Sequence, residues 1–265
     1  DRDYGALGHS RRADVIMLDD DLNVYNTWLG GQLVVENKKI TSLLDKQLSD
    51  NRYLYPQKAY KTVIIPKQIN LVPSIPDKEN FNINVIKTKL SGIMTFLETI
   101  KINKKHKSWN EILISHNLCH LCVIERHGKN GDFAHGFIKN FNLRSGAVAS
   151  SVGHDAHNII VSGLNEKDMK LAVELVNEYQ GGIVIVNNGK LISKVKLPIA
   201  GLLSDKKAYE VAEDNRLFKE NWSKSGCTLA YMGFNLLPLS VIPNVRLTNK
   251  GLVDVNKMMI MPLFE

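Results

Sequence analysis

Short apolar runs separated by turn-forming residues dominate the N-terminal part of the chain. Residues 13–18 form one run, and three aspartates, residues 19–21, follow it. Residues 24–29 and 32–36 form two more, and Gly30 and Gly31 stand between them. Runs of this length bounded by glycine and aspartate are typical of β-strands, and a glycine pair between two runs indicates a turn. We therefore expect a small unit of β-hairpins.

This periodicity fades between residues 42 and 76, where prolines interrupt the chain at Pro56, Pro66, Pro73 and Pro76. Each proline removes a backbone hydrogen-bond donor. The segment is predicted to be an extended connection with one short strand at residues 62–65. A domain boundary is expected within it.

Strand-like apolar runs return at residues 83–86, 121–125, 146–152 and 158–163. Residues 165–180 have apolar positions at the three- and four-residue spacing of a helix. Asn165 is a suitable N-cap with Asp168 three positions later, and Gly181 and Gly182 follow the helix. Asn188 and Gly189 then separate two apolar runs, which predicts a hairpin with a type I′ turn.

A second helix is expected at residues 206–224, capped by Ser204 or Asp205. Its buried stripe would consist of Ala208, Val211, Ala212, Phe218 and Trp222. The apolar tail, residues 236–243 and 253–263, should pack into the core. The overall pattern predicts an α+β chain, in which a small β-unit precedes a mixed domain of mainly antiparallel strands.

Composition agrees with a folded chain, since 44% of its 265 residues are apolar and 23% are charged. No apolar run approaches the roughly 18 residues that span a bilayer, and residues 1–4 contain no signal region. An odd count of three cysteines favours reduced thiols. We expect a cytoplasmic protein with no membrane partner. Because Asp1 rather than Met begins the sequence, we also expect a truncated or processed start.

The net charge of +7 raises the question of nucleic-acid binding. The basic run at residues 101–107 would be the core of such a surface. The alternative is a solvated loop in a lysine- and asparagine-rich chain. Aromatic residues are not interleaved with the basic ones, as stacking on bases requires. We therefore expect no nucleic-acid partner.

The densest polar cluster covers residues 150–158, between two predicted strands. Ser151, His154, Asp155, His157 and Asn158 stand on this loop. An aspartate beside a histidine can orient or charge an imidazole, and two histidines could ligate a metal, although such sites need three or four ligands. The alternative is a loop whose polar side chains cap their own backbone.

Two further clusters carry reactive side chains. Cys119 and Cys122 with His116 and His120 invite a zinc or redox interpretation, but apolar neighbours and missing ligands favour small buried hydrophobic side chains. Glu125, Arg126 and His127 stand together at a strand end. They could bind an anion or a polar ligand, or form a local ion pair.

Several blocks resemble one family. Residues 144–161 read RSGAVASSVGHDAHNIIV, residues 181–186 read GGIVIV and residues 197–205 read LPIAGLLSD. These blocks are similar to the signature of bacterial and archaeal adenine deaminases, which are metal-dependent amidohydrolases. Residues 123–127, 236–243 and 247–255 fit the same family, in the same order. Residues 5–7 and 11–18 resemble the stretch where amidohydrolases leave their barrel, with His9 and Ser10 where the family usually has Pro-Gly.

The resemblance implies a domain organisation. Residues 1–60 would be part of the small β-sandwich that flanks the amidohydrolase barrel. Residues 61–265 would be the C-terminal domain of adenine deaminases, a mixed and mainly antiparallel α/β domain. The (β/α)₈ barrel itself would be absent from this chain.

The family hydrolyses adenine to hypoxanthine and ammonia in purine salvage. It uses a divalent metal, Mn or Fe and possibly Zn, bound in the barrel with the help of a His-x-His pair. No His-x-His occurs in this chain, so no metal ligand and no catalytic residue is assigned to it. The chain alone is expected to be inactive.

The resemblance also gives the 151–158 loop a role at the mouth of the barrel. Ser151, His154, Asp155, His157 and Asn158 would form the rim of the active site or contact the substrate. Glu125, Arg126 and His127 are secondary candidates that could equally hold an interface together. The expected partners are the N-terminal metal-binding barrel half, adenine and further copies of the chain in a homo-oligomer. The alternative is a detached, non-catalytic module for purine binding or assembly.

Overall fold

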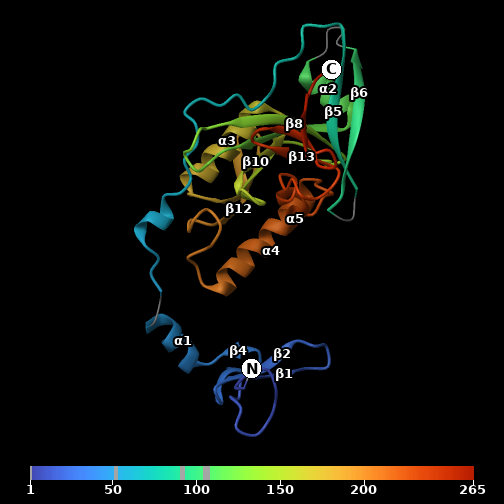
Figure 1. Ribbon diagram of the computed structural model, residues 1–265. Helices are drawn as coiled ribbons and strands as arrows, with labels where there is room; N and C mark the ends of the chain where they lie inside the picture. The colour runs from blue at the N-terminus through green and yellow to red at the C-terminus, as the bar shows by residue number, and fades with distance from the viewer. Residues whose placement is uncertain (1, 51–52, 90–92, 104–107) are drawn as a thin grey trace. The chain divides into compact units, whose positions relative to one another are not determined.

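The computed structural model describes residues 2–50, 53–89, 93–103 and 108–265 (Figure 1). Contacts between residues divide the chain into two compact units, Asp1–Tyr55 and Pro56–Glu265. Among the described residues, no helix is both long and apolar enough to cross a bilayer. The basic run is only partly covered, because residues 104–107 lie outside the described residues.

The N-terminal unit is an antiparallel sheet of four strands that follow one another in chain order. The strands are β1 (Val15–Leu18), β2 (Val24–Leu29), β3 (Gln32–Glu36) and β4 (Lys39–Ile40). Gly30 and Gly31 have positive φ angles of 56° and 81°, which confirms the predicted turn between β2 and β3. Ser10 takes a φ of 65° and Arg11 donates to the Gly8 carbonyl, so a turn forms here without Pro-Gly.

The prediction of an extended connection is wrong for its first part. Residues Ser42–Asp50 form helix α1, and Gln57–Tyr60 form the short 3₁₀ helix η1. The helix is possible because the first proline comes only at position 56, and the Thr41 hydroxyl accepts from the Leu44 backbone N–H at its start. The strand expected at residues 62–65 is a single bridge between Ile64 and His127.

The larger unit contains an eight-stranded sheet in the order β12-β11-β9-β10-β7-β8-β5-β6. All neighbouring strands are antiparallel except β5 and β8, which run parallel. The strands are β5 (Asn80–Thr88), β6 (Thr95–Asn103), β7 (Leu118–Ile124), β8 (Phe133–Lys139), β9 (Ala147–Gly153), β10 (Asn158–Gly163), β11 (Gly182–Asn187) and β12 (Lys190–Lys196). This confirms the predicted class, and the described residues contain no barrel.

Four helices and a small sheet pack against this sheet. They are α2 (Trp109–His116), α3 (Glu166–Glu178), α4 (Ala208–Lys224), α5 (Tyr231–Asn235) and the sheet of β13 (Val245–Thr248), β14 (Gly251–Asp254) and β15 (Met259–Met261). Helices α2 and α3 cover one face, and α4, α5 and the small sheet cover the other. Strand β7 shows this division, because side chains alternate along a strand. Leu118, Cys122 and Ile124 contact the α2 and α3 layer, and Cys119 and Leu121 contact the other.

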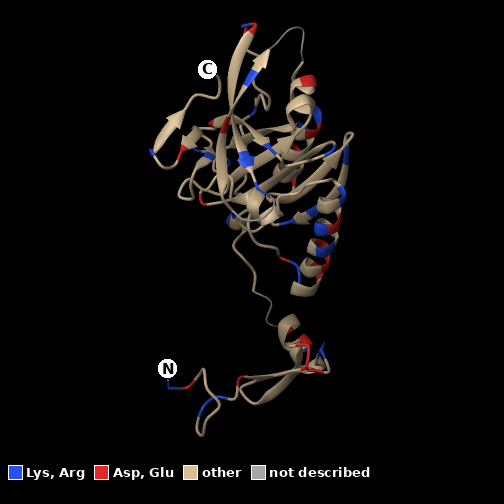
Figure 2. Cartoon of the chain, turned by 90° about the vertical axis from the view of Figure 1, so that its right-hand side faces the viewer, with Lys and Arg blue, Asp and Glu red and all other residues tan. Residues whose placement is uncertain are grey.

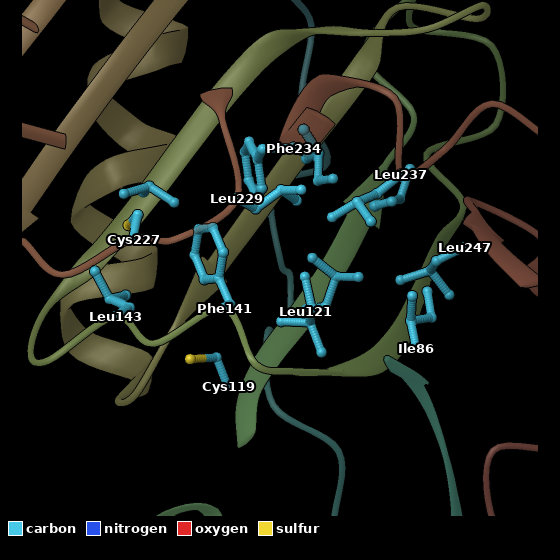
Figure 3. Packing of buried hydrophobic residues seen from close by; sticks show 14 of the residues in the cluster. Ile86, Cys119, Leu121, Phe141, Leu143, Cys227, Leu229, Phe234, Leu237 and Leu247 are labelled. Atoms are coloured by element: carbon cyan, nitrogen blue, oxygen red, sulfur yellow. The ribbon is translucent and has the colours of Figure 1, made fainter. Parts of the chain in front are cut away.

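The core beneath α4 and α5 is rich in aromatic side chains. Figure 3 shows Leu121 and Phe141 beside Leu229 and Phe234. The rings of Phe141 and Phe234 are stacked, with centroids 5.6 Å apart. Acidic and basic residues occur along α4 (Figure 2), where Arg216 pairs with Glu213 at 2.7 Å.

Three local predictions need correction. Of the predicted buried stripe on α4, Phe218 and Trp222 are buried, whereas Ala208 and Ala212 are exposed. Helix α4 begins at Ala208 rather than at residue 206, because the Ser204 hydroxyl accepts from Lys206 in the turn before it. The helix start is instead held by the Glu210 carboxylate, which accepts from the Lys207 backbone N–H at 3.0 Å. The apolar tail is buried only in part, since residues 258–260 belong to a turn and an edge strand and are 60% exposed or more.

Candidate functional site

The predicted functional loop is the connection between the antiparallel strands β9 and β10. Gly153 and Asn158 are paired across the strands, so residues 154–157 form a four-residue turn. Gly153 permits this close pairing, because a Cβ atom there would lie 2.7 Å from the Asn158 carbonyl oxygen. His157 closes the turn in the left-handed region, with a φ of 51°.

The turn brings two imidazole rings together. The ring centroids of His154 and His157 are 5.0 Å apart. Asp155 is 3.8 Å from the His154 Nδ1 atom, too far for a hydrogen bond, and its side chain is 81% exposed. His154 and Asp155 are therefore available to groups outside this chain.

His157 is partly enclosed, unlike the exposed Asp155 and Ala156. Its Nδ1 atom is buried and has no hydrogen-bond partner among the described residues. Burial lowers the pKa of His157, and the nearby His154 and Arg126 lower it further. The ring is therefore neutral at pH 7, and a neutral imidazole can donate through one nitrogen and accept through the other.

Ser151 and Asn158 do not form the exposed rim that the sequence predicted. Ser151 is completely buried in β9, where its hydroxyl accepts from the Gly182 N–H at 2.8 Å and donates to the Gly201 carbonyl at 2.6 Å. Asn158 is 4% exposed and its Nδ2 donates to Asn249 at 3.1 Å. Both residues also fall within the predicted strands 146–152 and 158–163, and the alternation of side chains along β9 and β10 turns both of them inward.

Arg126 fixes the loop from the segment that follows the neighbouring strand β7. Its side chain is buried, its Nε donates to the His157 carbonyl, and its Nη2 donates to the Ala200 carbonyl at 3.1 Å. Burial lowers the pKa of Arg126 to about 10, so the guanidinium remains charged at neutral pH. It packs against Gly201, where a Cβ atom would lie 2.7 Å from Nη1.

His127 and Glu125 complete this support. The His127 Nε2 atom is 2.7 Å from the Ala156 carbonyl, which can only accept. The buried Glu125 carboxylate accepts from the backbone N–H groups of His127, Lys129, Asn130 and Gly131. Burial by itself raises the pKa of Glu125, but these four donors lower it overall. In the contacts that this chain makes, Glu125, Arg126 and His127 therefore hold neighbouring loops in place.

The cysteine cluster cannot form one site. Cys119 and Cys122 lie three positions apart on β7, so their side chains point to opposite faces of the sheet and enter different cores. Both thiols are free and buried, and burial raises the pKa of Cys119 to about 12. This confirms the interpretation as small buried side chains.

The described residues do not fit a metal centre. Nowhere in them do three or more His, Cys, Asp or Glu side chains come together as a metal site requires. His154 and His157 are two potential ligands, and the third potential ligand, the Asp155 carboxylate, is largely exposed to solvent.

Comparison with known proteins decides the family. A family model described as the adenine deaminase C-terminal domain matches residues 92–259. The chain belongs to this family. The match includes Glu125, Arg126, His127 and the whole 151–158 loop.

Curated relatives match the N-terminal unit of the chain as well. Adenine deaminase 2 of Bradyrhizobium sp. (strain ORS 278) is 53% identical over 266 residues, which include all of this chain and 44% of the relative. The adenine deaminase of Chelativorans sp. (strain BNC1) is 53% identical over 264 residues, 99% of this chain and 44% of the relative. That of Clostridium botulinum (strain ATCC 19397 / Type A) is 34% identical over 273 residues, again 44% of its length.

The chain therefore spans less than half the length of these curated relatives and corresponds to their C-terminal portion. Two residues near the loop escaped the sequence analysis, namely Asn249, which binds Asn158, and Asn235, whose carbonyl accepts from the His154 N–H at 2.9 Å. No local signal could have identified them, because each lies about 80 to 90 positions from its partner along the chain.

Proposed function

We propose that this chain is the C-terminal part of an adenine deaminase, which converts adenine and water to hypoxanthine and ammonia. In this proposal the 154–157 turn covers or completes an active site whose reactive groups belong to the remainder of the enzyme. The observation that carries the proposal is the pair of imidazoles at 5.0 Å on a turn that Arg126 and His127 hold in place. The names and coverage of the relatives supply the reaction.

The chemistry of the turn suits a purine. Adenine is flat and has hydrogen-bond donors and acceptors around its edge, so a neutral imidazole such as His157 can bind either kind of group. An enzyme must also orient this ring and exclude water from it, which requires a cover over the site. A turn held by hydrogen bonds from Arg126 and His127 provides a preorganised cover, because little conformational entropy is lost on closure.

The metal implied by the family, Mn or Fe and possibly Zn, has no fitting ligand set among the described residues. No step of the reaction is therefore assigned to a metal held by this chain. We propose that the barrel half binds it, and that this chain alone releases no ammonia from adenine.

The N-terminal sheet supports a second contact with the remainder of the enzyme. Val34 is the single buried hydrophobic residue on its four described strands, whereas Ile16, Leu18 and Leu29 are between 42% and 57% exposed. Exposed apolar side chains on a sheet this small call for a partner surface. We propose that further strands of the enzyme cover it, as part of the sandwich that flanks the barrel.

The test uses the full-length enzyme and measures ammonia release from adenine. Replacement of both histidines, His154→Ala and His157→Ala, is expected to reduce kcat at least tenfold, equivalent to about 1.4 kcal/mol of transition-state stabilisation. The expected cause is the loss of groups that orient the purine and close the site.

The matched control is His9→Ala, which changes an exposed histidine of the N-terminal unit and should leave kcat unchanged. Unchanged kinetics in a normally folded double variant would disprove the covering role. Release of ammonia by the 265-residue chain alone would disprove the proposal that the reactive groups belong to the remainder of the enzyme. An active full-length enzyme with an unaffected double variant would favour the alternative, a purine-binding or assembly module.

A further inference from the structure

A hollow of about 540 Å³ lies between the large sheet and the helices α4 and α5. Its floor includes Val152, Ile183 and Val195 from three neighbouring strands, and its wall includes Val211 and Tyr231 from the two helices. Small-molecule sites commonly have volumes of roughly 300 to 1,000 Å³, with mostly apolar walls and a few placed polar groups. The hollow has the size and the wall composition of such a site.

Asn235 is the buried polar group of this hollow. It is 1% exposed, and its Oδ1 atom has no hydrogen-bond partner among the described residues. Buried polar atoms in folded proteins are almost always hydrogen-bonded, and among the described residues with an unpartnered buried polar atom, Asn235 is the one that lines this hollow. Asn235 also touches the candidate site, since its backbone carbonyl accepts from the His154 N–H.

We propose that this hollow binds a purine base and that the Asn235 side chain recognises its edge. A carboxamide presents an acceptor and a donor side by side. This pair matches an exocyclic amino group next to a ring nitrogen, the pattern by which asparagine binds adenine in two hydrogen bonds. The apolar floor and the Tyr231 side chain would contact the flat faces of the ring.

The choice of a purine rests on the proposed function, whereas the site itself rests on the hollow and its unpartnered amide. Binding is therefore measured on the 265-residue chain by isothermal titration calorimetry with adenine, with no dependence on turnover. One adenine per chain is expected. Purine, which lacks the amino group, should bind at least tenfold more weakly, because the Asn235 acceptor would be left unpaired.

Two variants test the assignment. Asn235→Leu keeps the size of the side chain and should reduce adenine affinity at least tenfold, because both hydrogen bonds are lost. Asn221→Leu is the matched control, since Asn221 lies on α4, bonds within that helix and does not line the hollow. It should bind adenine normally. Val211→Trp fills the hollow from its wall, leaves the amide in place and should also abolish binding.

Thermal unfolding separates a binding role from a structural one. If Asn235 serves a ligand, Asn235→Leu should raise the midpoint, because it removes an unpartnered buried polar group. The proposal is overturned if a folded chain, checked by circular dichroism, does not bind adenine. It is equally overturned if Asn235→Leu binds as tightly as the original chain, or lowers the midpoint without an effect on binding. None of these outcomes changes the expected kinetics of the His154 and His157 variants.

Discussion

His120 is the histidine most strongly affected by its position in the fold. Its ring lies in the middle of β7, with centroids 5.5 Å from Trp109 and 5.4 Å from Phe137. The Nδ1 atom is buried and without a partner among the described residues. Burial lowers the pKa of His120 from 6.5 to about 3, and the nearby His135 contributes to the shift. The folded protein therefore keeps this ring neutral under mildly acidic conditions.

The consequence is a pH-dependent loss of stability. Below pH 6.5 the unfolded chain takes up a proton at His120, whereas the folded chain does so only near pH 3. The free energy of unfolding should therefore fall as the pH drops through this window, by on the order of 2 kcal/mol at pH 5 from this residue. His120→Phe should remove that part of the dependence in urea unfolding at pH 7 and pH 5.

His9→Phe, on the exposed N-terminal segment, is the control for this measurement and should retain the loss at acidic pH. If the free energy of unfolding had the same pH dependence in His120→Phe and in the unsubstituted chain, His120 would take up its proton equally well in the folded and the unfolded chain.

At the scale of elements, the N-terminal capping sequence of helix α3 also makes a contact with a distant part of the chain. The Asn165 side chain accepts from the Asp168 N–H at 2.8 Å, as the sequence predicted for an N-cap. Asp168, however, is 2% exposed, and its carboxylate accepts from the N–H groups of Asn188 and Gly189 at 3.2 and 2.7 Å. The start of α3 is thus tied to the turn of the β11–β12 hairpin.

This arrangement predicts an order of destabilisation. Asn165→Ala removes the cap and should lower the free energy of unfolding by about 1 kcal/mol. Asp168→Ala should lower it by more, because it removes the buried carboxylate that accepts from two hairpin N–H groups, and each lost hydrogen bond contributes about 1 kcal/mol. Urea denaturation of both variants measures the difference. Asn177→Ala, on the same helix, is the control, and an equal or smaller loss for Asp168→Ala would contradict the role in the hairpin.

At the scale of the whole molecule, the first strand and the last residues of the larger unit lie side by side. The C-terminal residue pairs with β5, since the Asn82 and Glu265 backbones exchange hydrogen bonds of 2.8 and 3.0 Å. Ile83 and Phe264 form a further bridge between the same segments. The unit Pro56–Glu265 therefore contains its own sheet, its own cores and its own C-terminal closure.

We predict that residues 56–265 fold without the N-terminal unit. Circular dichroism should show a cooperative thermal transition within a few degrees of that of the larger unit in the complete chain, because the cores are contained in this segment. Residues 1–55 alone should not unfold cooperatively, since their sheet buries little apolar surface. A non-cooperative transition for residues 56–265 would show that the two units depend on each other.

The sequence predicted the positions of the residues in the 154–157 turn more accurately than the burial of the residues on either side of it. His154, Asp155 and His157 lie on the expected turn, but the strand pleat buries Ser151 and Asn158. Strand β6 and helix α2 were not predicted, although Ser108 and Glu111 form a capping box at the start of α2. That capping signal directly follows the basic run of residues 101–107, so its polar residues have the same pattern as the continuation of a charged loop.

Local chemistry was sufficient for some features because their interactions join residues close in the chain. The Asn188–Gly189 turn, the Asn165 cap and the antiparallel hairpin between β11 and β12 are of this kind. The tertiary structure alone decided the parallel pairing of β5 with β8, the burial of Arg126 beneath the loop and the position of Asn235 at the hollow. These depend on segments far apart in sequence, whose contacts form only when the whole sheet assembles, and no local pattern encodes them.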